Sequence, residues 1–136
     1  MKEIVNTKIK FREPFRPFAP AVLAEAAPRY FELPDPDRQM AARFMLLVVP
    51  VCEDQQATIP AVSHMGTARI QTVYPEASPL YHQVIKRFGE ATGVPVLLNT
   101  SFNVRGEPIV NTPKDAINTF VNSGIDTLVM GNYLIG

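Results

Sequence analysis

Two short clusters of polar and charged side chains stand out in this chain of 136 residues. Near the N-terminus, Lys10, Arg12 and Arg16 lie among the prolines and phenylalanines of the segment KFREPFRPF. Because proline fixes φ, this segment is stiff, and guanidinium groups held in place match the oxygens of a phosphate. The cluster therefore predicts an anion clamp, although solvated charges beside buried phenylalanines would give the same pattern.

The second cluster follows an apolar run. Residues 94–98 read VPVLL, long enough for one buried strand, and the chain then turns polar at Asn99, Ser101, Asn103 and Arg105. In open α/β sheets, ligands usually bind where such strands end. Amides, a hydroxyl and a guanidinium at this place suit an anion or a nucleotide. An Asx-rich turn that satisfies its own backbone would use the same residues, so both interpretations stay open.

A third group of candidates lies in the segment HMGTARIQTV. Apolar and polar residues alternate over 68–73, which predicts a half-buried strand that follows a turn at Gly66. His64 and Arg69 flank this turn and could contact a phosphate or move a proton, but a lone histidine is more often a structural hydrogen-bond partner. Cys52 is best interpreted as a small buried residue, since no histidine lies close to it in sequence.

Two helices are predicted with clear ends. The segment 78–91 begins with Ser-Pro, an N-cap followed by a first-turn proline, and Gly93 follows it. The segment 112–123 begins with Thr-Pro-Lys-Asp, a capping box with aspartate in place of glutamate, and Gly124 follows it. The expected buried stripes are Leu80, Val84, Ile85 and Phe88 on the first helix and Ala116, Ile117, Phe120 and Val121 on the second.

The remaining segments favour an α/β fold. We expect residues 4–11 to be extended, residues 21–33 to be helical around a proline, the apolar run 44–51 to be a buried central strand, and 128–130 to be the last strand before a turn. Strands and helices alternate in the second half, which predicts parallel pairing. The predicted architecture is a twisted mixed sheet with packed helices, formed as a single domain over residues 1–136.

Composition narrows the function classes. Thirteen basic and thirteen acidic residues give a formal net charge of zero, which argues against a nucleic-acid-binding protein, so an anion site must be local. One cysteine and two distant histidines make a poor structural zinc site. A single cysteine and the lack of a signal-peptide pattern predict a reducing, cytoplasmic compartment, and no apolar run reaches the length of a membrane span.

Four motifs in order carry a family resemblance: KIKFREPFRPFAPAVL, HMGTARIQTV, TGVPVLLNTSFNVRGEPIVNTPKDAI and DTLVMGNYLI. Together they resemble the C-terminal domain of the carbamoyltransferases that modify nodulation factors, cephalosporins and tobramycin. The resemblance implies a YrdC-like fold that makes carbamoyl adenylate from carbamoyl phosphate and ATP. Mg²⁺ would enter with the ATP, and no metal bound by this domain is expected. An N-terminal actin-like domain, which this chain does not contain, would pass the carbamoyl group to an acceptor hydroxyl.

The resemblance also implies which residues form the site. YrdC-like nucleotide pockets share a Lys-x-Arg pair and a Ser-x-Asn pair, and the sequence matches them with Lys10-x-Arg12 and Ser101-x-Asn103. These four residues are the catalytic candidates. The candidates for substrate binding are Arg16, His64, Arg69 and Asn99.

One motif departs from the family pattern. The family usually has His-x-Asp-Gly-Thr-Ala-Arg, whereas His64 is followed here by Met65 and Gly66, so the aspartate is missing. This departure puts the role of His64 in doubt. Two alternatives to adenylate formation remain: a non-catalytic module that binds nucleotides, anions or a partner protein, and binding of double-stranded RNA, against which the zero net charge argues.

Overall fold

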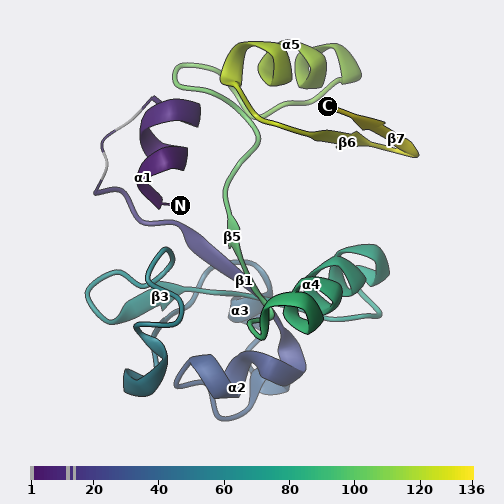
Figure 1. Ribbon diagram of the computed structural model, residues 1–136. Coiled ribbons are helices and arrows are strands. Elements are labelled where there is room, and N and C mark those ends of the chain that lie inside the picture. Colours follow the sequence, from purple (N-terminus) through teal and green to yellow (C-terminus); the bar gives the residue numbers. More distant parts are fainter. Residues whose placement is uncertain (1, 12, 14) are drawn as a thin grey trace. The chain divides into compact units, whose positions relative to one another are not determined.

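The computed structural model describes residues 2–11, 13 and 15–136 and has the α/β class that the sequence predicts (Figure 1). It divides into two compact units. We call Pro17–Asn99 the sheet unit, and Met1–Arg16 together with Thr100–Gly136 the terminal unit, because it contains both chain ends.

The sheet unit is built on three strands in the order β4-β1-β5. The central strand β1 (Ala19–Leu23) is parallel to β4 (Gln71–Val73) and antiparallel to β5 (Val96–Asn99). A separate antiparallel pair joins β2 (Val48–Pro50) to β3 (Thr67–Arg69). The sheet is mixed, as expected, but β4 and β5 lie on opposite sides of β1, so the predicted parallel pairing of the second-half strands is wrong.

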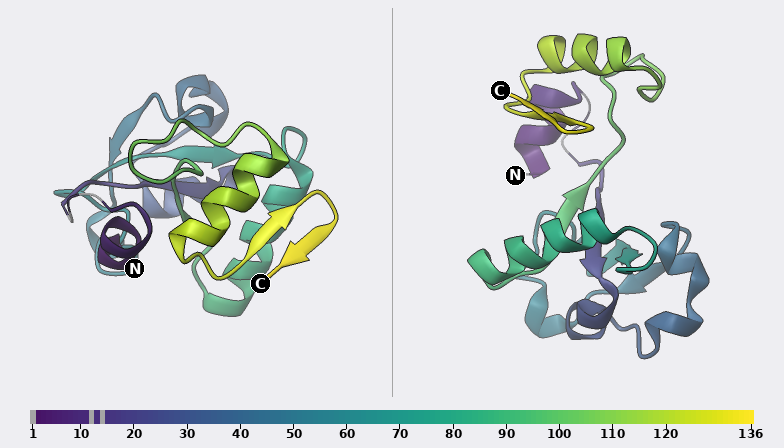
Figure 2. Two further views of the ribbon diagram at one scale, coloured as in Figure 1. Left: turned by 90° about the horizontal axis from the view of Figure 1, so that it is seen from above. Right: turned by 90° about the vertical axis from the view of Figure 1, so that its right-hand side faces the viewer.

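Side chains of β1 alternate between two apolar clusters, as the period of a strand requires. Ala21 and Leu23 pack with Val73 and Ile85, whereas Val22 faces the other cluster, which includes Tyr30. Helix α4 (Pro79–Thr92) contributes Ile85 and contacts β1 and β5, which it crosses in the right view of Figure 2. Both faces of the sheet are therefore covered by apolar side chains.

Short helices connect the strands of the sheet unit. They are α2 (Ala27–Tyr30), α3 (Met40–Arg43) and three single 3₁₀ turns, Ala24–Ala26, Pro36–Arg38 and Glu53–Gln55. Pro28 occupies the first turn of α2, but Ala21–Leu23 belongs to β1, so only part of the helix predicted over residues 21–33 is present. Alanine has high helix propensity, yet Ala21 has no exposed surface, and its fit in the crowded central strand overrides that propensity.

The apolar run 44–51 does not form a buried central strand. Only Val48–Pro50 is a strand, and it pairs with one neighbour. Val49 and Val51 are buried, whereas Phe44 and Leu46 are mostly exposed. Because this edge strand buries one face only, half of its apolar side chains face outward.

The terminal unit combines an N-terminal helical segment with α5 and a hairpin. The first segment consists of α1 (Lys2–Ile4) and a π-helical turn (Val5–Ile9), so the extended structure expected there is wrong. The reason is an i to i+5 hydrogen bond from Lys10 N to Val5 O at 2.8 Å, which closes the turn.

Helix α5 (Pro113–Ser123) packs beside the antiparallel pair β6 (Leu128–Met130) and β7 (Tyr133–Ile135), with a turn between the two strands as expected (Figure 2).

The bounds of both long helices are close to those predicted, and Thr112 and Asp115 form the predicted capping box of α5. Ser78 precedes α4 as predicted, but its side chain makes no capping hydrogen bond. Gly93 and Gly124 end α4 and α5 with φ of 81° and 69°, values that glycine adopts without strain. The expected buried stripes are only partly correct, since on α4 Ile85 is buried but Leu80 is 72% exposed. On α5, Ala116 is buried together with Thr119 and Ser123, whereas Ile117 and Val121 are exposed.

Candidate functional site

The Lys10 side chain lies at the centre of the polar cluster in the terminal unit. It is only 5% exposed, and its ammonium donates to the backbone oxygens of Ser101 and Asn103. It also reaches Asn103 Oδ1 at 2.8 Å and Ser101 Oγ at 3.4 Å. Four oxygens surround a group with three protons, so the buried charge is well satisfied. Lys10 thereby ties the N-terminal segment to a loop 91 residues further along the chain.

Asn103 extends this network into the next turn. Its Oδ1 accepts a second hydrogen bond, from Ser101 Oγ at 2.7 Å, and its Nδ2 donates to Glu107 O at 2.9 Å. Glu107 N donates to Val104 O at 3.3 Å and closes a β-turn whose third residue, Gly106, has φ of 85°. Type II turns require a positive φ at this position, which explains the glycine.

These residues surround a cavity of about 230 Å³, which we call the basic pocket. Its lining is Lys10, Glu13, Arg16, Ser101, Asn103, Val104, Arg105 and Gly106. Arg16 Nε pairs with Glu13 Oε2 at 3.0 Å, and both side chains are about half exposed, so solvent weakens the pair. Arg105 Nη1 donates to Phe11 O at 3.4 Å. Three cations face one carboxylate, which suits an anionic ligand.

The structure thus brings together four of the eight predicted site residues, namely Lys10, Arg16, Ser101 and Asn103. Arg12 lies outside the described residues. Arg105 belongs to the polar loop but is not among the predicted site residues. Its position beside Gly106, two residues after the Ser-x-Asn pair, was the signal that it shares a turn with the pocket.

His64 and Arg69 line a different cavity, within the sheet unit. Its volume is about 250 Å³ and its walls are mainly apolar; the other lining residues are Pro17, Phe18, Ala19, Val48, Val62, Thr67 and Ala68. His64 N donates to Thr67 O at 2.8 Å across a tight turn. Met65 and Gly66, between them, have φ of 51° and 74°, the pair of positive values that a type I′ hairpin turn needs. The segment that lacks the family's aspartate is therefore a two-residue hairpin turn.

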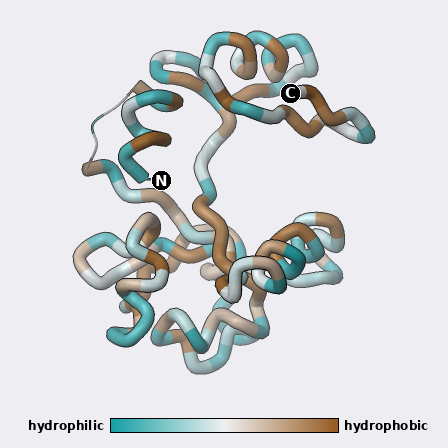
Figure 3. The backbone as a smooth tube through the Cα atoms, in the orientation of Figure 1, coloured by the Kyte–Doolittle hydropathy of each residue, from teal (hydrophilic) through white to brown (hydrophobic). Residues whose placement is uncertain are grey.

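Asn99 is the last residue of β5 and of the sheet unit. Its amide Nδ2 donates to Gln71 Oε1 at 2.7 Å and so ties β5 to β4 across the central strand. Figure 3 shows apolar colouring along β5 and a hydrophilic segment at its end. Asn99 therefore has a structural partner within its own unit.

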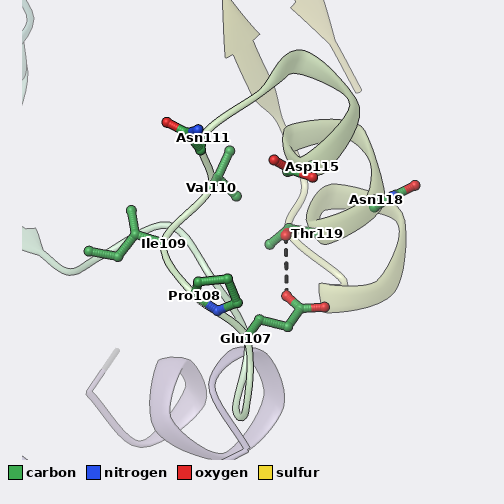
Figure 4. Close-up of a pocket in the computed structure, with 8 residues that line it drawn as sticks. All are labelled: Glu107, Pro108, Ile109, Val110, Asn111, Asp115, Asn118 and Thr119. Atoms are coloured by element: carbon green, nitrogen blue, oxygen red, sulfur yellow. Dashed lines mark hydrogen bonds between the residues drawn. The ribbon is translucent and has the colours of Figure 1, made fainter.

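A larger cavity of about 430 Å³ lies on the α5 side of the polar loop (Figure 4). It is lined by Glu107, Pro108, Ile109, Val110, Asn111, Asp115, Asn118 and Thr119. Thr119 Oγ1 and Glu107 Oε2 lie 3.3 Å apart, and this hydrogen bond joins α5 to the loop. Among the described residues, the lining has two carboxylates and no basic residue, so loop 101–111 borders a basic cavity and an acidic one.

His82 and Cys52 both belong to the sheet unit. The side chain of His82 on α4 is mostly buried, and its Nε2 lies 2.9 Å from Glu25 Oε1. Burial raises the pKa of the Cys52 thiol, with a further contribution from Asp54, so the thiol is a poor nucleophile. Among the described residues, no group of three or more His, Cys, Asp or Glu side chains could hold a metal ion. Every helix in that part of the chain is too short or too polar to cross a membrane.

Comparison with known proteins gives the family. The model for "Carbamoyltransferase C-terminus" matches residues 1–136. The chain belongs to this carbamoyltransferase C-terminal family. It is 49% identical over 135 residues to nodulation protein NolNO of Sinorhizobium fredii and 47% identical to nodulation protein NolO of Bradyrhizobium diazoefficiens. These matches cover 98% of the chain but 20% and 24% of the two relatives.

A relative named for its reaction is more distant. The 3'-hydroxymethylcephem-O-carbamoyltransferase of Amycolatopsis lactamdurans is 34% identical over 128 residues, which cover 92% of the chain and 23% of the relative. The chain thus spans about a fifth to a quarter of the length of these curated carbamoyltransferase-family proteins. The family resemblance read from the four motifs is confirmed.

Proposed function

We propose that this chain is the adenylate-forming part of a carbamoyltransferase and that its basic pocket binds the phosphates of ATP and of carbamoyl phosphate. The observation that carries the proposal is the contact of Lys10 with both Ser101 and Asn103, since these residues match the two pairs of the YrdC-like nucleotide pocket. Arg16 and Arg105 add positive charge around the same cavity. Membership of the carbamoyltransferase C-terminal family supports a part in carbamoyl transfer.

The proposed chemistry needs charge stabilisation more than acid–base catalysis. Water attacks the phosphorus of carbamoyl phosphate, the P–O bond to the carbamoyl group breaks, and carbamate and inorganic phosphate result. The anionic oxygen of carbamate then attacks the α-phosphorus of ATP. A bond forms between that oxygen and phosphorus, the bond to pyrophosphate breaks, and carbamoyl adenylate results. Because both reactants are anions, the reaction depends on positioning and on cations that offset their repulsion. Mg²⁺ would enter bound chiefly by the ATP phosphates.

The size of the basic pocket fits part of this ligand. Its volume of about 230 Å³ lies below the roughly 300–1,000 Å³ of pockets that enclose a whole small molecule. The pocket would therefore hold phosphate groups, while the base and ribose extend beyond it. His64, Arg69 and Asn99 belong to the sheet unit and are not among the residues that line this pocket.

Transfer to an acceptor would need another domain. The relatives are four to five times longer than the chain, and we propose that an N-terminal actin-like domain passes the carbamoyl group to a hydroxyl. One relative is named for a hydroxymethylcephem acceptor, and we propose that the acceptor here is likewise a molecule with a free hydroxyl group. A mixed anhydride is also rapidly hydrolysed in water, so a closed chamber between domains would protect it.

The test is titration calorimetry of the chain with ATP and Mg²⁺, with and without carbamoyl phosphate, followed by measurement of pyrophosphate release. We expect ATP to bind, slow release of pyrophosphate that requires carbamoyl phosphate, and no transfer to a hydroxyl acceptor by the chain alone. Asn103→Ala should weaken ATP binding, whereas Asn122→Ala, on the exposed side of α5, should leave it unchanged. Binding without any pyrophosphate release would indicate a non-catalytic nucleotide-binding module, and no binding would refute the proposal.

A further inference from the structure

Most polar groups that line the basic pocket already have partners within the protein. The three protons of the Lys10 ammonium face four loop oxygens. The Asn103 side chain accepts from Lys10 and Ser101 and donates to Glu107 O. A ligand that took these groups directly would have to break the network that shapes the loop. Lys10, Ser101 and Asn103 are therefore best placed to hold the loop in position.

Arg16 is only partly available to an anion. Its Nε lies 3.0 Å from Glu13 Oε2, and both residues line the pocket. A phosphate that approached Arg16 would also approach the Glu13 carboxylate, which repels it. The pair lowers the positive charge that Arg16 presents, although solvent screens the effect because both side chains are about half exposed.

Arg105 differs from Lys10 and from Arg16 because most of its donors have no hydrogen-bond or salt-bridge partner among the described residues. It occupies the second position of the turn Val104–Glu107, is exposed, and lines the basic pocket. One N–H of its guanidinium donates to Phe11 O at 3.4 Å, which leaves the other donors of the planar fork for a ligand. Within the described part of the chain, no carboxylate forms a salt bridge with it.

We propose that Arg105 binds phosphate oxygens of the ligand in the basic pocket, from a turn that the contacts of Lys10 with Ser101 and Asn103 hold in position. The guanidinium would take two oxygens of one phosphate, as its fork geometry favours. The proposal deepens the proposed function and rests on it for the identity of the ligand, but the phosphate contact itself can be measured with a simpler anion.

A substitution at Gly106 tests the contact between Arg105 and phosphate in a second, independent way. Its φ of 85° is strained for any residue with a Cβ, yet a Cβ there would meet no atom within 4 Å. Gly106→Ala thus disturbs the backbone of the turn without a steric clash and without removing charge. If the backbone of the turn fixes the position of the Arg105 guanidinium, this variant should weaken anion binding by several-fold.

The experiment is calorimetric titration of the chain with inorganic pyrophosphate and, separately, with ATP and Mg²⁺. Arg105→Ala should weaken both by about 10- to 100-fold, the range for loss of charged hydrogen bonds. Arg105→Lys should recover only part of the pyrophosphate affinity, because lysine keeps the positive charge but cannot form the two parallel hydrogen bonds of a guanidinium. Arg87→Ala, at an exposed site on α4, is the matched control and should change neither affinity. Thermal melts should show that the Arg105 variants stay folded.

The outcomes separate this inference from the proposed function. If the wild-type chain binds both ligands and Arg105→Ala binds them equally well, the role of Arg105 is wrong and the proposed function stands. If pyrophosphate binds through Arg105 but ATP does not bind, the phosphate subsite stands and the adenylate-forming function falls. Failure of the wild-type chain to bind either ligand would overturn both.

Discussion

The interior of each of the two units is stabilised by a different kind of contact. Both apolar core clusters consist of residues from the sheet unit. Among the described residues of the terminal unit, the buried side chains are mostly polar: Asn6, Lys10, Thr119 and Ser123, with Ala116 and Leu128 as apolar members. The sheet unit is therefore stabilised mainly by burial of apolar area, and the terminal unit mainly by hydrogen bonds.

This difference matters for function because the basic pocket belongs to the terminal unit. Hydrogen bonds contribute about 0.5–1.5 kcal/mol each, whereas a fully buried aliphatic side chain contributes about 1.5–3 kcal/mol. We expect a unit that relies on polar contacts to open locally at a lower free-energy cost than a unit with an apolar core. The comparison predicts that apolar truncations act on the sheet unit and polar truncations on the terminal unit.

The largest effect should come from Ile85→Ala. Ile85 has no exposed surface and packs with Ala21, Leu23 and Val73, so the truncation leaves a cavity and should cost about 2–5 kcal/mol of unfolding free energy. Leu80→Ala, on the same helix but 72% exposed, should change stability by less than about 0.5 kcal/mol. Urea denaturation measures both. Equal losses would show that the outer face of α4 is buried in solution.

Lys10→Met should act on the other unit. Methionine keeps the length and apolar stem but leaves the oxygens of Ser101 and Asn103 without their buried donor, so the loss should be about 2–3 kcal/mol. Hydrogen exchange should show less protection in residues 100–111 and unchanged protection in β1 and β5. Lys8→Met, exposed in the same segment, is the control. Equal loss of protection in the sheet strands would contradict independent stabilisation.

Local signals in the sequence predicted helix ends and turns well. The capping box at Thr112, the glycines after α4 and α5, and the turn at Gly66 depend on neighbouring residues alone, and the structure has all of them. Pairing of strands did not follow from local pattern. The central strand is alanine-rich β1, whose small side chains fit between two crowded faces, and this depends on contacts distant in sequence.

In the candidate site, too, the sequence predicted some features, whereas others depend on contacts between residues distant in the chain. The matched pairs at Lys10 and Ser101 identified residues that meet across 91 positions, because the family resemblance carries three-dimensional information that spacing lacks. Spacing alone did not reveal that the Lys10 ammonium is fully satisfied by loop oxygens, or that Glu13 pairs with Arg16. Both facts depend on side-chain geometry, and they are what single out Arg105.

Gly89→Ala tests how closely α4 packs against the start of β5 within the sheet unit. Glycine to alanine in a helix normally stabilises by about 0.5–1 kcal/mol. A Cβ at Gly89 would lie 2.7 Å from Pro95 Cβ and 3.0 Å from Pro95 Cα, so the helix or the start of β5 must move. We expect the sign to reverse, with a loss of about 1–3 kcal/mol from overpacking. Gln83→Ala, at an exposed position of α4, is the control, and thermal melts measure both. A stabilised Gly89→Ala variant would mean that α4 and Pro95 are not in close contact.

The smallest effect should come from Thr112→Ala, in the terminal unit. Thr112 Oγ1 accepts from Asp115 N at 3.2 Å, and the Asp115 carboxylate accepts from both the hydroxyl and the N–H of Thr112. Loss of the N-cap should cost about 1 kcal/mol. The Thr112 hydrogen bonds also hold the pKa of Asp115 below its ordinary value of 3.8.

A depressed pKa in the folded state gives the pH dependence its sign. The contribution of Asp115 is present at pH values above its unfolded pKa and is lost as the pH falls through the lower folded value, so the acid-sensitive window lies below about pH 4. Thr112→Ala removes the hydroxyl donor and should flatten this part of the stability profile, whereas Thr92→Ala, at the far end of α4, should leave its shape unchanged. Urea denaturation between pH 2.5 and 7, in roughly half-unit steps, would show the change as a smaller slope at the acid end. An unchanged acid slope in Thr112→Ala would mean that the capping box contributes nothing to the terminal unit, and hydrogen bonds would then be a poor account of what holds that unit together.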